Sequence, residues 1–459
     1  MPFPLYLAAV ATTMAAGFFA LSRWFSRRRR QASAPSRLAG GVTATAFGSQ
    51  AGGMSVISYC YTDLPWKLMM ADMYQFARLA WAVPYILLPM CPSDSDDLDE
   101  LALTWKNAFC VVVHVVLAVL QLLFLVSLPL AALFPVWVVA LGVSGFLLLN
   151  HVLCMLLNSR DTEFTSDPCY APALPEHARE QWIFLNGVAV GEHWMKNNLN
   201  RLALTFKRPI RGIHNRTSGI LFDIIECLVQ RNFQYATSDV RMCYSLIKET
   251  LHDDRFDKVV FILHSQGGIE GGLVLDWLLQ ELPQELLSRL EVYTFGCAAN
   301  HFNNPRRHAH SEAERRGGRE EANGAAVPPQ PNGRAERPSR PSRRTPRPAD
   351  AVASDPDAAA TWAPALITET SSKRPSKISD RVIGHIEHYA HTFDFVALWG
   401  VLHFTSAAHK SQTMPRFIGR VFARSSDRGG HQFNLHYLNG MYVGPPPSFR
   451  WWQLLYSYG

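Results

Sequence analysis

The apolar positions between residues 180 and 300 follow two alternating patterns. Short apolar stretches that are rich in β-branched or aromatic side chains, and bounded by charged residues or glycine, are typical of buried strands. Three stretches of this kind are residues 181–185, 259–263 and 291–295. Three others repeat their apolar side chains at helical spacing, namely residues 219–230, 238–251 and 267–279. Strands that alternate with helices predict an α/β fold with a mainly parallel sheet and flanking helices.

The hydrophobic pattern stops after His301 and resumes at Arg381. The stretch between them is rich in Arg, Pro, Ala, Ser, Gly and Glu, and such a composition cannot bury enough apolar surface to order itself. We therefore expect a disordered insertion over residues 306–380, because the cost of closing a loop rises only slowly with its length. The domain that carries it is predicted over residues 180–305 and 381–445.

A long apolar segment precedes this domain. Residues 109–157 contain no Asp, Glu, Lys or Arg, and one membrane-spanning helix needs about 20 residues, so the segment has room for two. Pro129 and Pro135 lie in its middle, where a turn tolerates the missing N–H groups. The pattern predicts a transmembrane hairpin with helices at residues 109–128 and 136–157.

The N-terminal segment predicts a further membrane anchor. Residues 4–21 are apolar and are followed by Arg23 and by four arginines at positions 27–30. A secretory signal peptide carries its positive charge before the apolar region, whereas arginines that follow the region fit an anchor that keeps them in the cytosol. Residues 1–31 are therefore assigned to the anchor.

Residues 32–108 are predicted to link the anchor to the hairpin. Their stretch 64–90 carries aromatic rings among aliphatic side chains, including Trp66 and Trp81. Such rings prefer the headgroup level of a membrane, so this stretch is expected to lie along the interface. The acidic stretch 93–100 predicts a solvated connector that leads into the next helix.

Positive charges flank the hairpin at Lys106 and Arg160. Because a hairpin returns the chain to the side that it left, both charges and the domain that follows are predicted to face the cytosol. The endoplasmic reticulum or a lipid droplet fits this topology. Residues 1–62 contain no acidic side chain, which also suits a mitochondrial transit segment, so a mitochondrial membrane is the alternative location.

Charge and cysteine content argue against several classes of function. The formal net charge is +6 at pH 7, but the arginines gather near the N-terminus and within the insertion, without the interleaved aromatic rings that stack on bases. We therefore predict no nucleic-acid partner. The eight cysteines form no CxxC motif and no Cys/His pair at zinc-ligand spacing. His385, His388 and His391 recur at every third position without a partnering carboxylate constellation, so no metal and no cofactor are expected.

The best candidate for chemistry is Ser265, within the sequence HSQGG. It lies between a predicted buried strand and a predicted helix, which is the context of a nucleophile elbow. A serine hydroxyl becomes a good nucleophile when a histidine takes its proton and a carboxylate orients that histidine. Asp394 follows a later apolar stretch and His431 follows another. His436, five residues further on, remains an alternative base.

Other polar residues near these positions are weaker candidates. Glu387 or Asp380 could replace Asp394, but Asp394 comes after its strand, where a carboxylate can reach a histidine. His264 precedes the serine directly, and neighbouring side chains of a strand point to opposite faces. It is therefore expected to pack within the turn rather than to act as the base.

The order Ser, Asp, His and the strand-turn-helix context resemble the α/β-hydrolase superfamily, and lipase-like serine esterases in particular, including uncharacterised membrane-anchored members seen in fungi. The resemblance covers residues 180–442 without the insertion, and it does not cover the membrane segments. It implies that Ser265 is the nucleophile, Asp394 the orienting acid and His431 the base.

The resemblance also implies an oxyanion hole. One donor would be the backbone N–H of Gln266, and the loop at Asn186, Gly187 and Val188 would supply another. The chain departs from the family's elbow pattern at Leu263, where a small residue is the rule. Small residues let the strained turn fit between strand and helix.

Two classes of function are open at this point. The first is a membrane-anchored serine hydrolase that cleaves an ester or thioester, with a lipid or acyl ester as its substrate and the bilayer as its partner. The second is a non-catalytic membrane scaffold that retains a hydrolase fold and binds other proteins through the insertion. Leu263 and the insertion motivate the second class, and the sequence names no protein partner.

Overall fold

The computed structural model describes residues 43–47, 63–90, 96–305, 381–408, 417–425 and 429–439. The predictions for the N-terminal anchor and for the insertion lie outside these residues. The fold is therefore described for the sheet, its helices, the hairpin and the segments that connect them.

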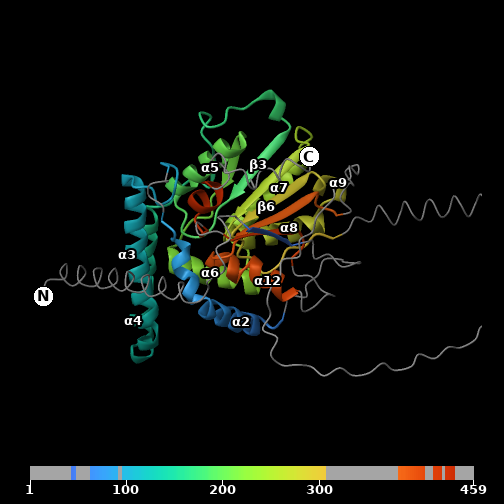
Figure 1. The fold of residues 1–459 in the computed structure, drawn as a ribbon. Coiled ribbons are helices and arrows are strands. Elements are labelled where there is room, and N and C mark those ends of the chain that lie inside the picture. Colours follow the sequence, from blue (N-terminus) through green and yellow to red (C-terminus); the bar gives the residue numbers. More distant parts are fainter. Residues whose placement is uncertain are drawn as a thin grey trace, which may run out of the picture. The chain divides into compact units, whose positions relative to one another are not determined.

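One mixed sheet forms the centre of the fold (Figure 1). From edge to edge its strands are β1 (Thr43–Phe47), β8 (Arg420–Ser425), β7 (His385–His391), β6 (Leu290–Phe295), β5 (Lys258–His264), β3 (Glu180–Leu185), β4 (Ile210–Ile213) and β2 (Glu163–Thr165). The inner strands are parallel, whereas β1 and β2 pair antiparallel with β8 and β4. The mainly parallel α/β sheet that the sequence predicted is confirmed.

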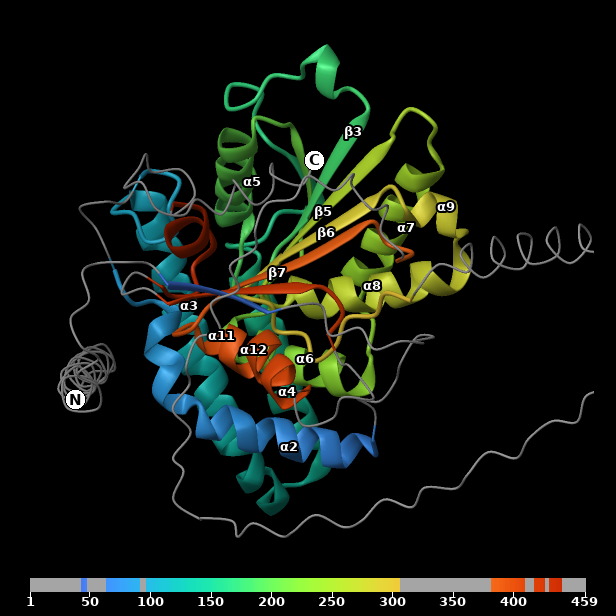
Figure 2. The ribbon, with the colours of Figure 1, turned by 45° about the vertical axis from the view of Figure 1, so that its right-hand side comes forward.

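Helices cover both faces of the sheet (Figure 2). One face carries α5 (Glu192–Phe206) and the short π-helical η5 (Phe433–Leu438), and the other carries α6 (Ile220–Phe233), α7 (Ser238–His252), α8 (Gly267–Glu281), α9 (Gln284–Leu287), α11 (Phe395–Trp399) and α12 (Val401–Ala408). Along β5, Phe261 and Leu263 enter one buried core while Val260 and Ile262 enter the other. A strand whose successive side chains are all buried needs this cover on both faces.

The sheet reaches beyond the stretches that the sequence marked as strands. β1 lies within the segment predicted as a linker, and β2 lies between the hairpin and the predicted domain. Both are short edge strands with antiparallel pairing. Strands of three to five residues do not show enough alternation to be recognised from their pattern.

The long apolar segment forms two helices, as predicted. α3 (Trp105–Ser127) continues into the 3₁₀ turn η3 (Leu128–Leu133), and α4 (Val136–Cys154) follows Pro135. Both helices are long and apolar enough to cross a membrane. One face of α3 is packed against the domain, whereas α4 is buried only at Asn150 and Cys154.

The predicted interfacial stretch forms α2 (Pro65–Arg78) and the 3₁₀ helix η1 (Ala80–Ile86). α2 is joined to the domain by Asp72, which is buried and pairs with Arg231 of α6. Arg231 also lies over the Trp399 ring, 3.9 Å from its centroid. Because an unpaired buried charge is strongly destabilising, this contact holds α2 against the domain.

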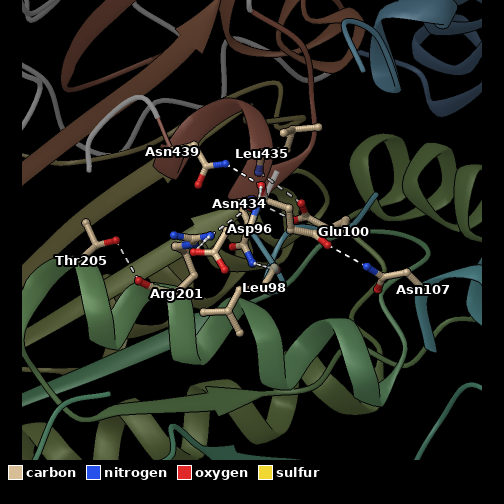
Figure 3. A network of polar contacts seen from close by, with 10 residues as sticks. Asp96, Leu98, Glu100, Asn107, Arg201, Thr205, Asn434, Leu435 and Asn439 are labelled. Atoms are coloured by element: carbon tan, nitrogen blue, oxygen red, sulfur yellow. Dashed lines mark hydrogen bonds and ion pairs between the residues drawn. The ribbon is translucent and has the colours of Figure 1, made fainter. Parts of the chain in front are cut away.

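The acidic stretch that leads into α3 is not the solvated connector that we predicted. Asp99 and Glu100 are buried. Asp99 accepts from Arg201 of α5 at 3.1 Å and from Asn439 at 2.7 Å, and the Glu100 carboxylate accepts from the backbone N–H of Asn434 at 2.8 Å (Figure 3). The prediction was wrong for these two residues, since their partners come from distant segments that the local pattern does not reveal.

Candidate active site

Ser265 lies at the sharp turn between β5 and α8, where the sequence placed a nucleophile elbow. Its φ angle is +57°, a left-handed conformation that costs energy for a residue with a side chain. Three backbone hydrogen bonds hold the turn: Ser265 N–H donates to Phe295 O at 3.1 Å, and Ser265 O accepts from Gly268 N–H at 3.0 Å and from Ala298 N–H at 3.1 Å. The strained serine is therefore fixed against the end of β6.

Glycines let the loop after β3 approach this turn. A Cβ on Gly187 would collide with Ser265 Cβ and lie 3.0 Å from Ser265 Oγ. A Cβ on Gly267 would lie 2.6 Å from Leu185 O, at the end of β3. Only glycine fits at both positions, so the backbone of residues 186–188 lies directly beside Ser265.

The large side chain of Leu263 is accommodated by Gly271 of α8, about one helical turn after Gly267. A Cβ on Gly271 would collide with Leu263 Cδ1 and lie 2.7 Å from Leu263 Cδ2. Leu263 is fully buried in the core between the sheet and α8. The small residue that the family pattern places on the strand is thus replaced by a small residue on the facing helix, which removes the main reason for expecting a distorted elbow.

Ser265, His431 and Asp394 form one hydrogen-bonded series. His431 Nε2 lies 2.9 Å from Ser265 Oγ, and His431 Nδ1 lies 2.9 Å from Asp394 Oδ2. A carboxylate only accepts hydrogen bonds, so Nδ1 carries the proton and Nε2 is left to accept from the serine hydroxyl. Asp394 follows β7 and His431 follows β8, in the positions that the sequence predicted.

Asp394 is held in its ionised form by several donors. It is fully buried, which by itself would raise its pKa, but the ring of His431, the Tyr437 hydroxyl and the Val396 N–H together lower that pKa below its usual value. Tyr437 donates to Oδ2 at 2.6 Å and Val396 N–H donates to Oδ1 at 2.8 Å. The acid is therefore a carboxylate at neutral pH, ready to stabilise a protonated His431.

Sequence reasoning did not find two residues that shape this series. Tyr437 lies in η5, six residues after His431, and nothing in its local pattern marks it. Gly296 closes β6 with φ +54°, and a Cβ there would lie 2.8 Å from Asp394 Oδ2 and 3.0 Å from the His431 ring. The glycine at the strand end was visible in the sequence, but its role depends on which strands are neighbours.

The alternative base does not reach the serine. His436 Nε2 lies 3.0 Å from Pro89 O, and its Nδ1 accepts from Gln432 N–H at 2.9 Å. Burial lowers the pKa of His436 to about 4. His264, as expected, is not the histidine that contacts Ser265 Oγ. Its ring stacks on that of His431, and its Nε2 contacts His431 O at 3.1 Å.

The remaining candidate acids and histidines of this region contact groups other than Ser265 and His431. Glu387 lies within β7 and contacts His385 and the Tyr389 hydroxyl. His388 contacts Thr294 Oγ1 at 2.9 Å, and His391 contacts His436 O at 3.0 Å. Asp380, the other alternative acid, is outside the described residues.

The predicted oxyanion donors lie beside the serine. Among the described residues, neither Gln266 N–H nor Val188 N–H donates a hydrogen bond to another group. The loop that carries Val188 is held by Asn186, whose side chain donates to Asn215 O at 2.9 Å, and by Ala189 N–H, which donates to Asp223 Oδ2 at 2.9 Å. Two free N–H groups on a braced backbone suit a developing oxyanion.

Asp223 is a further positioning residue that the sequence did not reveal. Besides Ala189 N–H it accepts from Thr217 Oγ1 at 2.6 Å and from Ser218 N–H at 2.7 Å. Burial raises the pKa of Asp223 to about 6. This one carboxylate ties the loop after β3 to the start of α6.

A cavity of about 320 Å³ opens at Ser265 and His431, within the range of small-molecule sites. Apolar side chains form most of its wall. They include Val83 and Leu87 at η1, Val111, Val115 and Ala118 on α3, Ile220 and Ile224 on α6, and Phe395 and Val396 at α11. α3, the first of the two helices long and apolar enough to cross a membrane, is therefore part of the wall of the candidate active site.

Three carboxylates from α6, α7 and α8 meet at one place. Glu226, Asp239 and Glu270 bring oxygens within 4.8 Å of one another, close enough to hold a cation. Burial raises the pKa of Glu226 to about 7 and that of Glu270 well above its usual value. Gln230 donates to Glu270 at 3.1 Å. The amide donor, and the protonation that the raised pKa values of Glu226 and Glu270 favour, reduce the repulsion between these groups.

Comparisons of the chain with protein-family models, with curated proteins and with solved structures found no match. The case for a function consequently rests on the geometry of Ser265, His431 and Asp394 and on the cavity beside them.

Proposed function

We propose that this chain is a serine hydrolase of the α/β-hydrolase type that cleaves an ester or thioester of a lipid. The observation that carries the proposal is the hydrogen-bonded series from Ser265 Oγ through His431 to Asp394, with 2.9 Å at each step. The strained serine between β5 and α8, the donors in the loop after β3 and the chain order Ser, Asp, His support the family resemblance.

The reaction follows from this geometry. Ser265 Oγ attacks the carbonyl carbon of the substrate while His431 Nε2 takes the hydroxyl proton. The electron pair of the C=O bond moves to the oxygen, which Gln266 N–H and Val188 N–H stabilise. The tetrahedral intermediate then collapses, and the leaving alcohol or thiol receives the proton from His431. Water attacks the acyl-serine by the same steps and restores Ser265.

The apolar wall of the cavity supports a lipid acyl group as the part of the substrate that is bound. Burial of methylene groups contributes about 0.8 kcal/mol each, so a long acyl chain gains affinity from this wall where a short one does not. The wall also includes Val111, Val115 and Ala118 of α3. A substrate that already resides in a membrane is thus close to Ser265.

The orientation of the domain is proposed from the charges that flank the hairpin. Lys106 and Arg160 are both exposed and lie near the ends of α3 and α4 that adjoin the domain. Positive charge at these ends favours the cytosolic side. We place the domain in the cytosol, on the endoplasmic reticulum or a lipid droplet.

An active-site-directed fluorophosphonate tests the proposal. The purified chain should be labelled covalently, and Ser265→Ala should abolish the labelling, because only an activated serine attacks the phosphorus centre. Ser238→Ala, at an exposed serine at the start of α7, is the matched control and should be labelled as strongly as the original chain. Labelling that persists in Ser265→Ala would assign the nucleophile to another residue and refute the proposed site.

A further inference from the structure

α3 is packed against the domain over only part of its length. Its buried residues repeat at helical spacing from Asn107 to Gln121, and after Gln121 no residue of the hairpin is buried until Asn150. The exposed face of α3 is apolar both before Gln121, at Val112 and Val116, and after it, at Leu123. Composition therefore does not tell how deep the hairpin enters a membrane, but its contacts with the domain do.

Two amides fasten the hairpin at the level where its buried face ends. Gln121 Nε2 donates to Asn150 Oδ1 at 2.9 Å and to Ser218 O at 2.7 Å, and Gln121 Oε1 accepts from Leu221 N–H at 3.2 Å. Asn150 Nδ2 also donates to Ser218 O, at 3.1 Å. These contacts prevent the hairpin from sliding along the domain. Arg216, an exposed charge two residues before Ser218, places this level near water.

The part of the hairpin beyond this level is too short to cross a bilayer. Its arms are residues 122–133 and 136–149. At 1.5 Å per α-helical residue and about 2 Å per 3₁₀ residue, each arm reaches roughly 20 Å. The hydrocarbon core is about 30 Å thick. The tip would therefore stop near the middle of the bilayer and not at its far side.

The tip is also unsuited to water. Leu133 and Val136 on either side of the turn are 78% and 85% exposed, and Trp137 next to them is 67% exposed. The turn between the arms has no charged residue. A hairpin that crossed the bilayer would expose these side chains to water on the far side, whereas a hairpin that ends inside the hydrocarbon buries them.

A second apolar surface lies at the same end of the domain. α2 turns Asp72 and Phe76 toward the domain and exposes Trp66, Met70 and Met73 on its other face. In Figures 1 and 2 both α2 and the tip of the hairpin lie at the lower end of the domain. A helix with one apolar face and aromatic rings suits the boundary between headgroups and acyl chains.

We propose that the α3–α4 tip and the outer face of α2 insert together into a single leaflet of a phospholipid membrane, and that the hairpin does not span it. The tip reaches the centre of the membrane while α2 lies among the headgroups. This revises the transmembrane hairpin expected from the sequence. It also allows the chain to bind a phospholipid monolayer, which has no second aqueous face.

If the proposed hydrolase function is right, single-leaflet insertion also indicates how substrate arrives. The cavity at Ser265 is bounded by Val83 and Leu87 at η1, which follows α2 in the chain, and by Val115 of α3, which lies before the hairpin arms. A lipid can then move its acyl chain from the leaflet into the cavity without crossing water. The depth of insertion itself does not depend on catalysis.

Quenching of tryptophan fluorescence by brominated phospholipids tests the depth. The full chain carrying Ser265→Ala is bound to phosphatidylcholine vesicles, and the signal of Trp137 is obtained as the difference from the same chain with Trp137→Phe. Lipids brominated near the terminal methyl group should quench this difference signal at least threefold more than lipids brominated near the headgroup. Stronger quenching by the shallow bromines would overturn the proposal, and so would the absence of quenching by any of the lipids.

A charge placed at the tip gives a second test that does not use fluorescence. Leu133→Lys should lower the fraction of chain that floats with vesicles at least tenfold, because its charge would lie in hydrocarbon. Leu103→Lys, two residues before α3 and 94% exposed, should leave flotation unchanged. Unaltered flotation of Leu133→Lys would show that the tip reaches water and would refute the single-leaflet depth. Neither readout measures hydrolysis, so a failed serine site would not affect them.

Discussion

Asp394 shows how much of the candidate chemistry depends on single contacts. It accepts from His431, Tyr437 and Val396 and has no exposure to water. An amide of the same shape has one donor end, which must face one of these donors. The carboxylate is therefore the form that this environment selects, since a buried donor without an acceptor costs about 1–3 kcal/mol.

We predict that Asp394→Asn lowers kcat for a soluble ester by about 10³ to 10⁴-fold, because an amide no longer holds Nδ1–H of His431 toward itself and the ring adopts the wrong tautomer. The measurement is steady-state hydrolysis of a p-nitrophenyl ester by the detergent-solubilised chain. Asp161→Asn, at an exposed position after the hairpin, serves as the control. A loss of less than tenfold would exclude Asp394 from this role.

The contact between Leu263 and Gly271 makes a second prediction at the scale of residues. Gly271→Ala places a Cβ against Leu263 Cδ1 and should destabilise the fold by about 1–3 kcal/mol, while Leu263→Ala should cost about 2–5 kcal/mol through the cavity that it leaves. The double variant should be more stable than the sum of the two losses predicts. Strict additivity in urea unfolding would show that the two side chains are not coupled.

The sequence predicted the residues of the site whose positions follow from local pattern. Ser265, Asp394 and His431 lie one, three and six residues after the ends of β5, β7 and β8, and parallel strands bring such positions to one edge of a sheet. Local pattern could not separate His431 from His436, because both follow β8. In the structure His431 contacts Ser265, whereas His436 lies within η5 and contacts Pro89 O. Tyr437 and Asp223 were missed since their partners are distant in the sequence.

At the scale of elements, the segment before α3 braces the segment that carries the base. Glu100 accepts from Asn434 N–H at 2.8 Å and from Leu435 N–H at 3.3 Å, at the start of η5 (Figure 3). Asn434 Nδ2 also donates to Leu98 O at 2.6 Å. Since η5 begins two residues after His431, residues 98–100 help to fix the position of His431 from outside the predicted domain.

This brace gives a prediction about pH. Burial raises the pKa of Glu100 from 4.5 to about 7, so between these values the folded chain binds a proton that the unfolded chain has lost. The free energy of unfolding contributed by Glu100 therefore falls as the pH rises from about 4.5 to about 7, by up to about 3 kcal/mol. Glu100→Gln should lose this part of the pH dependence.

Urea unfolding of the detergent-solubilised chain at pH 5 and at pH 8 measures the effect. Compared with the original chain, Glu100→Gln should show a smaller decrease in stability between the two values. Glu176→Gln, at an exposed glutamate, should show the original decrease. Other acids with raised pKa values, such as Asp223 and Glu226, contribute equally to all three chains, so they cancel in the comparison. Parallel pH profiles for all three would contradict the assigned role of Glu100.

The elements that escaped prediction share a physical reason. β1 and β2 are short and pair antiparallel at the edges of the sheet, and strands of three to five residues do not show a clear apolar alternation. The acidic run before α3 resembles a solvated connector because burial of Asp99 depends on Arg201 and Asn439, far along the chain. Long elements with many buried positions, such as β5 and α8, were predicted close to their observed bounds.

At the scale of the whole molecule, the two ends of the insertion are joined within the domain. Val382 N–H donates to Pro305 O at 3.0 Å, and Asn304 exchanges two hydrogen bonds with the backbone of Ile383, at 3.0 and 3.1 Å. Arg381 also donates to Asn304 O at 2.8 Å. The chain therefore leaves and re-enters the domain at one place, which is where an insertion disturbs the fold least.

We predict that replacing residues 306–375 by a short Gly-Ser linker leaves the domain folded, with a change in unfolding free energy below about 1 kcal/mol, because loop-closure entropy depends weakly on length. Thermal unfolding and fluorophosphonate labelling of the shortened chain provide the measurement. Deletion of residues 300–304 as a comparison should abolish folding, since these residues are buried. A shortened chain that fails to fold would show that the insertion is part of the core.

Gln121 makes the contacts that join the hairpin to the domain. These contacts link the proposed membrane insertion to the proposed catalysis. Gln121→Leu removes the contacts with Ser218 O, Leu221 N–H and Asn150 and leaves the part-buried Leu221 N–H without this acceptor, while it makes the hairpin more apolar. The variant should therefore still bind membranes, but α3 should no longer be held at the cavity that it lines with Val111, Val115 and Ala118.

The expected result is a change in chain-length preference. For Gln121→Leu we predict that kcat/KM for a long-chain ester falls at least tenfold while that for an acetyl ester stays within about threefold, since only the long chain uses the α3 wall. Leu123→Ala, at an exposed site two residues away, should retain the original preference. Equal losses for both esters would indicate general unfolding instead, and no loss for either would show that the wall formed by α3 does not bind substrate, even where Ser265 remains the nucleophile.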